Sequence, residues 1–185
     1  MSADGDASPG VKVWDRPVRL LHWALALCCV AAWITSEVLL RWHEPIGYAA
    51  LAIVAARIAW GFAGGPYARF AQFVRTPRDT WAYAVAVQRG SAVRYVGHNP
   101  LGGWMALALW SCVAALGVTG WLYTTDMFWG TGWLDLTHQV LAWLLVALVA
   151  LHLAGVVHTG RKHGDHLVAA MLDGRKRPAG PGDIA

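Results

Sequence analysis

The sequence predicts an all-α integral membrane protein, in which four helices cross the membrane as one bundle and both termini lie in the cytoplasm. Three observations support this prediction. Of the 185 residues, 57% are hydrophobic and only 14% are charged, whereas soluble domains carry about 25% charged residues. Four apolar segments are long enough to span a bilayer, for which about 20 residues suffice. The Lys and Arg residues gather in the loops of one side.

The predicted spans cover about residues 18–40, 45–63, 100–123 and 135–158. Pro45 and Pro100 stand at the starts of the second and third spans, where a missing backbone N–H breaks no helical hydrogen bond. We interpret the whole chain, residues 1–185, as one domain. The first segment, MSADGDASPG, has no basic stretch ahead of a short apolar core, so we expect no cleaved signal peptide and interpret the first span as an uncleaved anchor of a multi-pass membrane protein.

Thirteen of the 15 basic residues lie on one side of the predicted bundle. Three lie before or at the start of the first span, five lie in the loop 64–99 and five follow the fourth span, while the two loops on the other side hold only Arg41. Because Lys and Arg are enriched in cytoplasmic loops, both termini and the loop 64–99 are predicted to be cytoplasmic. The net charge of +4 is therefore interpreted as topology, and no nucleic-acid partner is expected.

The loop 64–99 contains the segment TPRDTWAYAVAVQRG, which has two interpretations. One is an interfacial helix, with Asp or Thr near its start and Gly90 after its end. The other is a plain connector with a helical turn or two. The three cysteines, Cys28, Cys29 and Cys112, all fall in apolar runs, and we interpret them as small buried hydrophobic residues.

Four histidines lie in or beside the apolar spans, at two predicted depths. His22 and His152 lie near the cytoplasmic face, and His43 and His138 lie near the outer face. His138 and His152 are 14 residues apart on one helix, which corresponds to about 21 Å and returns to nearly the same side of the helix. The sequence therefore predicts two pairs across helices, His22 with His152 and His43 with His138.

Any one of these imidazoles could be an ordinary buried histidine. Ionisable groups within membrane spans are rare and mark function, and four that pair at two depths favour two metal sites. Imidazole binds iron, copper and zinc. Two opposed histidines without a carboxylate or thiolate beside them fit a six-coordinate haem b in a helical bundle. Glycines and alanines on the facing helices would leave room for haem, and they equally suit close helix packing.

Two further polar residues lie near the predicted cytoplasmic face. Arg57 follows His43 by 14 residues, which places it near the depth of the His22–His152 pair. An arginine there needs an anion, such as a haem propionate, or else it extends to the lipid headgroups. His98, before the third span, would line a quinone pocket, bind a propionate, or stabilise the helix entry.

Several motifs together resemble the bacterial cytochrome b561 family. They are VWDRPVRLLHW, His43 followed by Gly47 and Arg57, GHNPLGGW, and THQVLAWLLVALVALH with a basic tail. The resemblance covers nearly all of residues 12–177. The wider group includes the b-type subunits of nickel–iron hydrogenases and formate dehydrogenases.

The resemblance implies a four-helix membrane protein with two haem b groups, one near each face. It implies the iron ligands His22, His43, His138 and His152, in the pairs that depth already predicts. It also implies electron transfer between a quinone and a redox partner protein, such as a c-type cytochrome. Two alternatives stay open, a superoxide:quinone oxidoreductase and a haem-bearing membrane anchor subunit of a larger oxidoreductase, so enzymatic activity is left undecided.

The outer loop GWLYTTDMFWGTGWLD is rich in aromatic residues and has no basic residue. An aromatic belt at the membrane interface explains this composition, and a docking face for a periplasmic cytochrome is the alternative. Superoxide is an anion and would be steered by positive charge. The outer side holds one basic residue against four acidic ones, which disfavours superoxide chemistry: Arg41 against Glu37, Glu44, Asp126 and Asp135.

Overall fold

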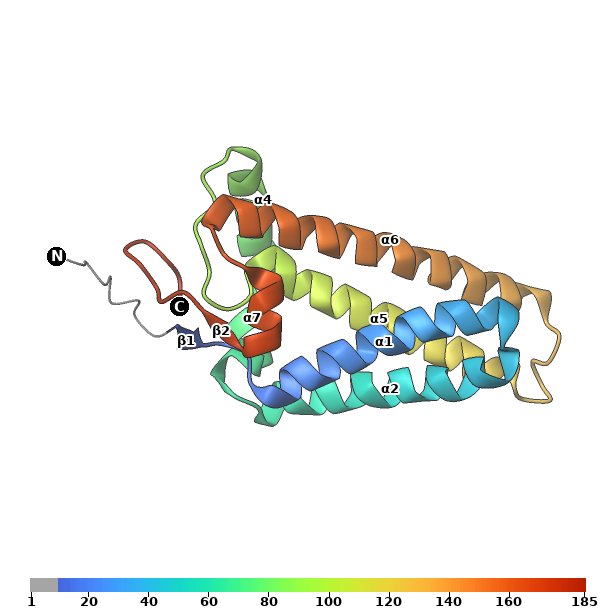
Figure 1. Ribbon diagram of the computed structural model, residues 1–185. Coiled ribbons are helices and arrows are strands. Elements are labelled where there is room, and N and C mark those ends of the chain that lie inside the picture. Colours follow the sequence, from blue (N-terminus) through green and yellow to red (C-terminus); the bar gives the residue numbers. More distant parts are fainter. Residues whose placement is uncertain (1–9) are drawn as a thin grey trace.

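The computed structural model describes residues 10–185 and is dominated by four long helices (Figure 1). These are α1 (Arg16–Val38), α2 (Leu40–Ala63), α5 (Pro100–Tyr123) and α6 (Gly132–His163). Each is long and apolar enough to cross a membrane, which confirms the predicted all-α bundle of four spanning helices. Residues 1–9, on which most of the signal-peptide prediction rests, lie outside the described part.

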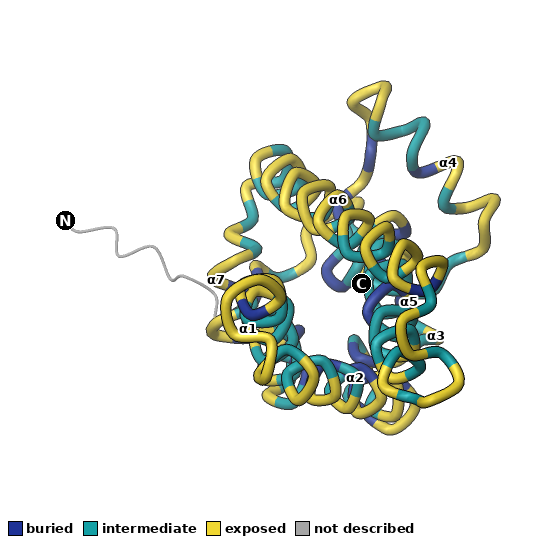
Figure 2. The backbone as a smooth tube through the Cα atoms, turned by 90° about the vertical axis from the view of Figure 1, so that its right-hand side faces the viewer, coloured by how far each residue is buried: buried dark blue, intermediate teal, exposed yellow. Residues whose placement is uncertain are grey.

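The four helices form a ring in which sequence neighbours pack side by side, and α2 also packs along α5. Figure 2 looks along the bundle, and its buried positions lie mostly on the faces turned toward the other helices. Ala50 and Val54 of α2 and Val113 of α5 form a small core against which Leu25 and Trp110 pack. The most apolar stretch of α6 contains no buried residue. This helix therefore presents most of its surface outside the protein core.

Local caps explain where three of the spanning helices begin and end. The Asp15 carboxylate accepts a hydrogen bond from the Val18 N–H at 2.9 Å and caps α1. Asn99 does the same for α5, accepting from the Gly102 N–H at 2.7 Å, directly before Pro100. Helix α6 runs to His163 and stops at Gly164, whose φ of 64° belongs to the left-handed region that glycine tolerates. Its 32 residues span about 48 Å, so α6 extends beyond a hydrocarbon layer of about 30 Å.

The predicted start of the second span at Pro45 was wrong. Helix α2 begins at Leu40, so Pro45 lies inside the helix. A single residue, Leu39, separates α1 from α2, and its N–H donates to the Thr35 carbonyl at 3.3 Å. The tight connection at Leu39 determines where α2 starts, and α2 accommodates Pro45 in its second helical turn. As a result His43, which was expected to precede the helix, lies within it.

The short elements gather at the bundle end that holds strand β1 and the C-terminus, which we call the inner end (Figure 1). They are β1 (Val11–Lys12), η1 (Pro66–Ala68), α3 (Phe70–Phe73), α4 (Pro77–Gln88), α7 (Leu167–Asp173) and β2 (Arg175–Lys176). Strands β1 and β2 pair antiparallel, and Figure 1 shows α7 crossing between α6 and α1. Helix α4 lies within TPRDTWAYAVAVQRG and is capped by Thr76. Its position at a membrane surface stays a prediction, as does the cytoplasmic location of the inner end.

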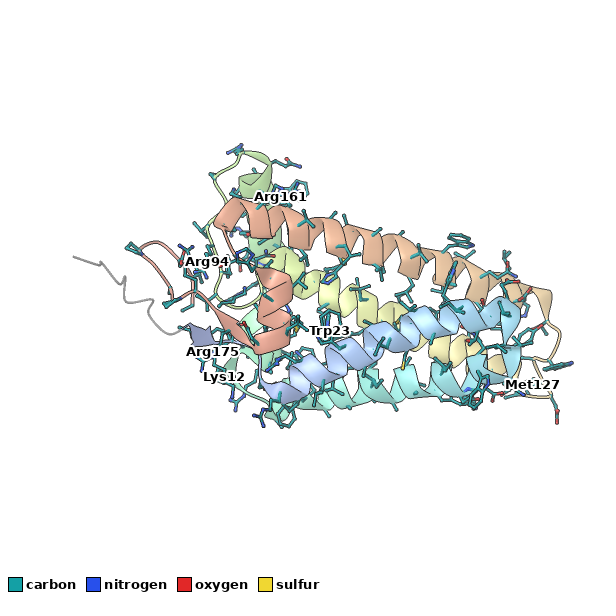
Figure 3. The ribbon with its side chains drawn as sticks, viewed as in Figure 1. Lys12, Trp23, Arg94, Met127, Arg161 and Arg175 are labelled. Carbon is teal, nitrogen blue, oxygen red and sulfur yellow. The ribbon has the colours of Figure 1, made fainter. Side chains whose placement is uncertain are left out.

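Arg94 joins three distant segments at the inner end (Figure 3). Its guanidinium is buried and binds both oxygens of Asp165, at 2.8 and 3.0 Å, and one oxygen of Asp183 at 2.6 Å. Two backbone carbonyls, of Arg177 and Pro178, accept its remaining hydrogen bonds. The hydrogen bond to Asp165, followed by that to Asp183, raises the pKa of Arg94. The C-terminal segment is thereby fixed to the loop before α5.

Candidate functional site

His43 of α2 and His138 of α6 face each other at the outer end, which is the bundle end opposite to the inner end. Their ring centroids are 6.1 Å apart and the ring planes are inclined by 73°. Two imidazoles that bind one metal ion from opposite sides, with bonds of about 2.0 Å, place their centroids about 6 Å apart. The separation of the two rings therefore matches what a single shared metal ion requires.

Both rings make a hydrogen bond through Nδ1. The Nδ1 of His43 lies 2.9 Å from the Ala32 carbonyl oxygen, which can only accept, so Nδ1 carries the proton. Its Nε2 is left with its lone pair, which is the form that binds metal. The Nδ1 of His138 lies 2.8 Å from the Thr119 hydroxyl oxygen. When that hydroxyl donates to the Ala115 carbonyl, 2.9 Å away, it accepts from His138 and leaves the Nε2 of this ring with its lone pair as well.

Thr119 of α5 was missed by the sequence reasoning, whereas Gly120 is one of the glycines expected to leave room for haem. Thr119 orients His138, and Gly120 lies against the same ring, because a Cβ built on it would stand 3.5 Å from the His138 Cε1. A threonine in an apolar helix commonly bonds only its own preceding turn. The sequence signal that could have identified Thr119 is its position one turn before the outer end of α5, at the depth of His138.

The inner pair, His22 of α1 and His152 of α6, is arranged differently. The Nδ1 of His22 is buried and has no hydrogen-bond partner among residues 10–185, and its ring meets Trp23 edge-on at 5.1 Å. The two histidines make no ring contact like that of the outer pair within the described chain. Both histidines nevertheless lie near His98, because the charge of each acts on that residue.

Arg57 is buried at the inner end and does not extend to a lipid surface. Only 5% of the residue is exposed. Its Nη2 donates to the Ala68 carbonyl at 3.2 Å, and the guanidinium lies 4.8 Å from the centre of the Trp110 ring. Its Nη1 is buried and has no protein partner among residues 10–185. The side chain therefore keeps one donor free inside the bundle, which favours the anion-binding interpretation over the headgroup one.

His98 lies between the rings of Trp14, at 4.6 Å, and Phe73, at 5.2 Å. Burial, followed by the charges of Lys176, Arg57, His152 and His22, lowers the pKa of His98 to about 3. Its Nδ1 is buried and has no partner in the described chain. The side chain that caps α5 is that of Asn99, so the helix-entry interpretation, which paired His98 with Asn99, is confirmed for Asn99.

Three further histidines follow His152 in the sequence. His158 is exposed on α6. His163 ends α6 and His166 precedes α7. The three cysteines are free thiols. Met127, 81% exposed, marks the tip of the aromatic outer loop in Figure 3.

The fold and the outer histidine pair define a class: a membrane protein with four spanning helices and two histidines of different helices that face each other. The model of the prokaryotic cytochrome b561 family matches residues 13–174. The chain therefore belongs to the prokaryotic cytochrome b561 family, and it is a membrane b-type cytochrome of electron transfer, which implies haem b as its cofactor.

Two curated relatives agree with this assignment. A protein of Azotobacter vinelandii named "Probable Ni/Fe-hydrogenase B-type cytochrome subunit" is 23% identical over 211 residues, which cover 89% of this chain and 87% of the relative. A protein of the same name from Azotobacter chroococcum mcd 1 is 24% identical over the same shares of the two chains. No solved structure matches the chain.

Proposed function

We propose that the protein is a diheme cytochrome of the bacterial inner membrane, which carries electrons between the quinone pool and a redox partner protein. The proposed ligands are His43 with His138 for one haem and His22 with His152 for the other. The observation that carries the proposal is the outer pair, whose ring separation is 6.1 Å and whose Nδ1 atoms both make a hydrogen bond to a neighbouring helix.

When bound, haem b supplies an iron that takes up and gives up one electron at a time. The chain supplies the rest. His43 and His138 would hold the iron through Nε2, while the Ala32 carbonyl and the Thr119 hydroxyl keep the rings from rotating. Partners of this kind on the second ring nitrogen also raise the basicity of the ligand.

Helix α6 would hold both haems at a fixed distance. His138 and His152 are 14 residues apart on this one helix, which sets a separation of about 21 Å along its axis. Leu141, Leu145 and Leu148 lie between them and are partly buried. These apolar side chains exclude water from the space between the two sites. Without water, the effective dielectric constant is low, so the charged groups beside each site interact with it more strongly.

Haem counting on the purified protein tests the proposal. A pyridine haemochrome assay should give two haems b per chain in the wild type and one in His138→Leu and in His152→Leu. His158→Leu is the matched control, because this histidine lies exposed on the same helix, and it should keep both haems. A single haem in the wild type, or full haem content in either ligand variant, would disprove the ligand assignment.

A second candidate function is a haem-bearing anchor for a larger oxidoreductase. It is favoured by the two relatives, which are both named as cytochrome subunits of a Ni/Fe-hydrogenase. In this case a catalytic subunit should co-purify with the chain at a fixed ratio. If the chain instead purifies alone and its haem is reduced by a quinol and reoxidised by a c-type cytochrome, the first function holds.

A further inference from the structure

A continuous stack of basic and aromatic side chains lies at the inner end, beyond the proposed iron ligands. Lys176 lies 5.6 Å from the centre of the Trp14 ring, and that ring contacts His98. His98 contacts Phe73, and the Arg57 guanidinium lies 5.9 Å from the centre of the Phe73 ring. We call Arg57, His98 and Lys176 the inner basic cluster. It joins α2, the loop before α5 and strand β2.

The members of the inner basic cluster are buried without adequate partners. Lys176 is only 8% exposed, and its Nζ reaches one carbonyl, that of Gly97, at 3.4 Å. The Arg57 Nη1 and the His98 Nδ1 are buried and unpartnered among residues 10–185. Burial, followed by the charge of Arg94, lowers the pKa of Lys176 to about 8, against the opposing effect of Asp165. A buried charge of this kind requires a counter-charge.

Residues 10–185 do not supply that counter-charge. Asp165, the acidic group that acts on Lys176, is bound through both oxygens by Arg94. Asp15, whose charge reaches Arg57, accepts hydrogen bonds from Val18, Trp60 and Gly65. The groups whose charges act on His98 are all basic. The cluster therefore has excess positive charge. A quinone head group is neutral and would not balance this charge.

We propose that the inner basic cluster holds the two carboxylates of the inner haem, so that the C-terminal strand takes part in binding the cofactor. This proposal rests on the proposed function. Two propionates supply two negative charges, and charge-assisted hydrogen bonds to Arg and Lys are the strong kind. Lys176 and His98 thereby join Arg57 as positioning residues, none of which touches the iron.

Lys176→Met tests the proposal, because it removes the charge and keeps an apolar chain of similar length. Loss of a nearby cation disfavours the reduced haem. At a fixed potential we expect the oxidised-to-reduced ratio of one haem to rise about tenfold, a shift of about 59 mV for a one-electron couple. The affected haem should be the one that His152→Leu removes. Its propionate vibration in the resonance Raman spectrum should shift as well. Lys176→Arg should restore both readouts.

Two further variants complete the experiment. Lys12→Met is the matched control, since Lys12 is exposed on β1, which pairs with β2, and it should leave the potentials and the Raman spectrum unchanged. His98→Phe keeps the aromatic stack but removes both ring nitrogens. If Lys176→Met does not assemble, this variant still tests the cluster through the same Raman shift.

The possible outcomes separate this inference from the proposed function. If the wild type binds two haems while Lys176→Met and His98→Phe leave the potentials and the Raman spectrum unchanged, the inference is wrong and the diheme assignment stands. If these variants raise the KM for quinol with both haem readouts unchanged, the cluster serves the quinone instead, and the inference is also overturned. If the wild type binds fewer than two haems, the proposed function fails first.

Discussion

The two ends of the bundle surround their histidine pairs in contrasting ways. At the outer end, His43 and His138 each make one hydrogen bond to a residue of a neighbouring helix, and the charged residues of that end are mainly acidic. At the inner end, His22 and His152 lie near His98, which also lies near the buried basic groups Arg57 and Lys176 from two other segments. The difference indicates that ring orientation governs the outer site, whereas charge governs the inner one.

The contrast also concerns the range of the contacts. The hydrogen bond between Thr119 and His138 joins residues 19 positions apart, while Arg94 binds Asp183 across 89 positions. Substitutions at the outer end should therefore change how tightly a haem is held. Substitutions at the inner end should change the stability of the whole end and the potential of its haem.

The largest effect is expected for Arg94→Met, which would leave two carboxylates at the inner end without their partner. Removing one member of a buried ion pair costs about 3–5 kcal/mol, and the side chains of Arg94 and Asp165 are only 3% and 5% exposed. Thermal unfolding in detergent should show the loss. Arg89→Met, at an exposed position after α4, should change the unfolding temperature little. Equal effects of the two variants would show that the ionic network does not hold the inner end.

At the outer end, Thr119→Val should weaken haem binding by about 10–100-fold, the usual effect of removing a partner of a ligating histidine. The rate of haem transfer to apomyoglobin measures this change. Thr119→Ser keeps the hydroxyl and should bind haem like the wild type. Thr137→Val removes a hydroxyl of α6 that bonds only the Trp133 carbonyl, and it serves as the control. If the valine variant releases haem no faster than this control, orientation does not govern the outer site.

Substitutions of two glycines with positive φ at the inner end allow the effect of backbone strain to be distinguished from that of steric crowding. Gly164→Ala, with a φ of 64° and no neighbour within 4 Å, should destabilise the protein by the left-handed strain alone, about 1–2 kcal/mol. Gly174→Ala, with a φ of 85°, would in addition place a Cβ 2.6 Å from the Trp14 carbonyl oxygen. We expect a larger loss for Gly174→Ala in urea unfolding. Similar losses of stability in the two variants would mean that the backbone at Trp14 and Gly174 moves apart at little cost to admit the added Cβ.

The smallest effect is expected for Trp23→Phe. The Trp23 indole donates to the Met171 carbonyl at 3.3 Å and links α1 to α7, beside which Figure 3 places it. Because this hydrogen bond is exposed and long, its loss should cost about 0.5 kcal/mol. Faster hydrogen exchange in α7 would detect it. Trp121→Phe, at the exposed outer end of α5, should leave the exchange of α7 unchanged; an equal increase there would argue against the link.

Local signals explain what the sequence could predict. Asn99 and Pro100 place the start of α5 correctly, because a capping side chain and a proline act within one turn. The depth argument also brought His43 and His138 together, although their role as iron ligands stays a prediction. Pro45 misled the reasoning, because the α1–α2 turn is set by tertiary packing. The pairing of Arg94 with Asp165 and Asp183 depends on the path of the whole chain, so no local sequence pattern predicts it.

The hydrogen bonds that join the C-terminal segment to the loop before α5 impose an order on biosynthesis. Val96 donates to the Ile184 carbonyl at 2.8 Å, and Ile184 donates to the Arg94 carbonyl at 2.9 Å. A ribosome adding about 5–20 residues per second finishes His138 several seconds before it reaches Ile184. His138 is therefore part of the growing chain before the residues that join at the inner end are made. A cofactor that enters from the inner end has that interval in which to bind, before Ile184 forms its hydrogen bonds with Arg94 and Val96.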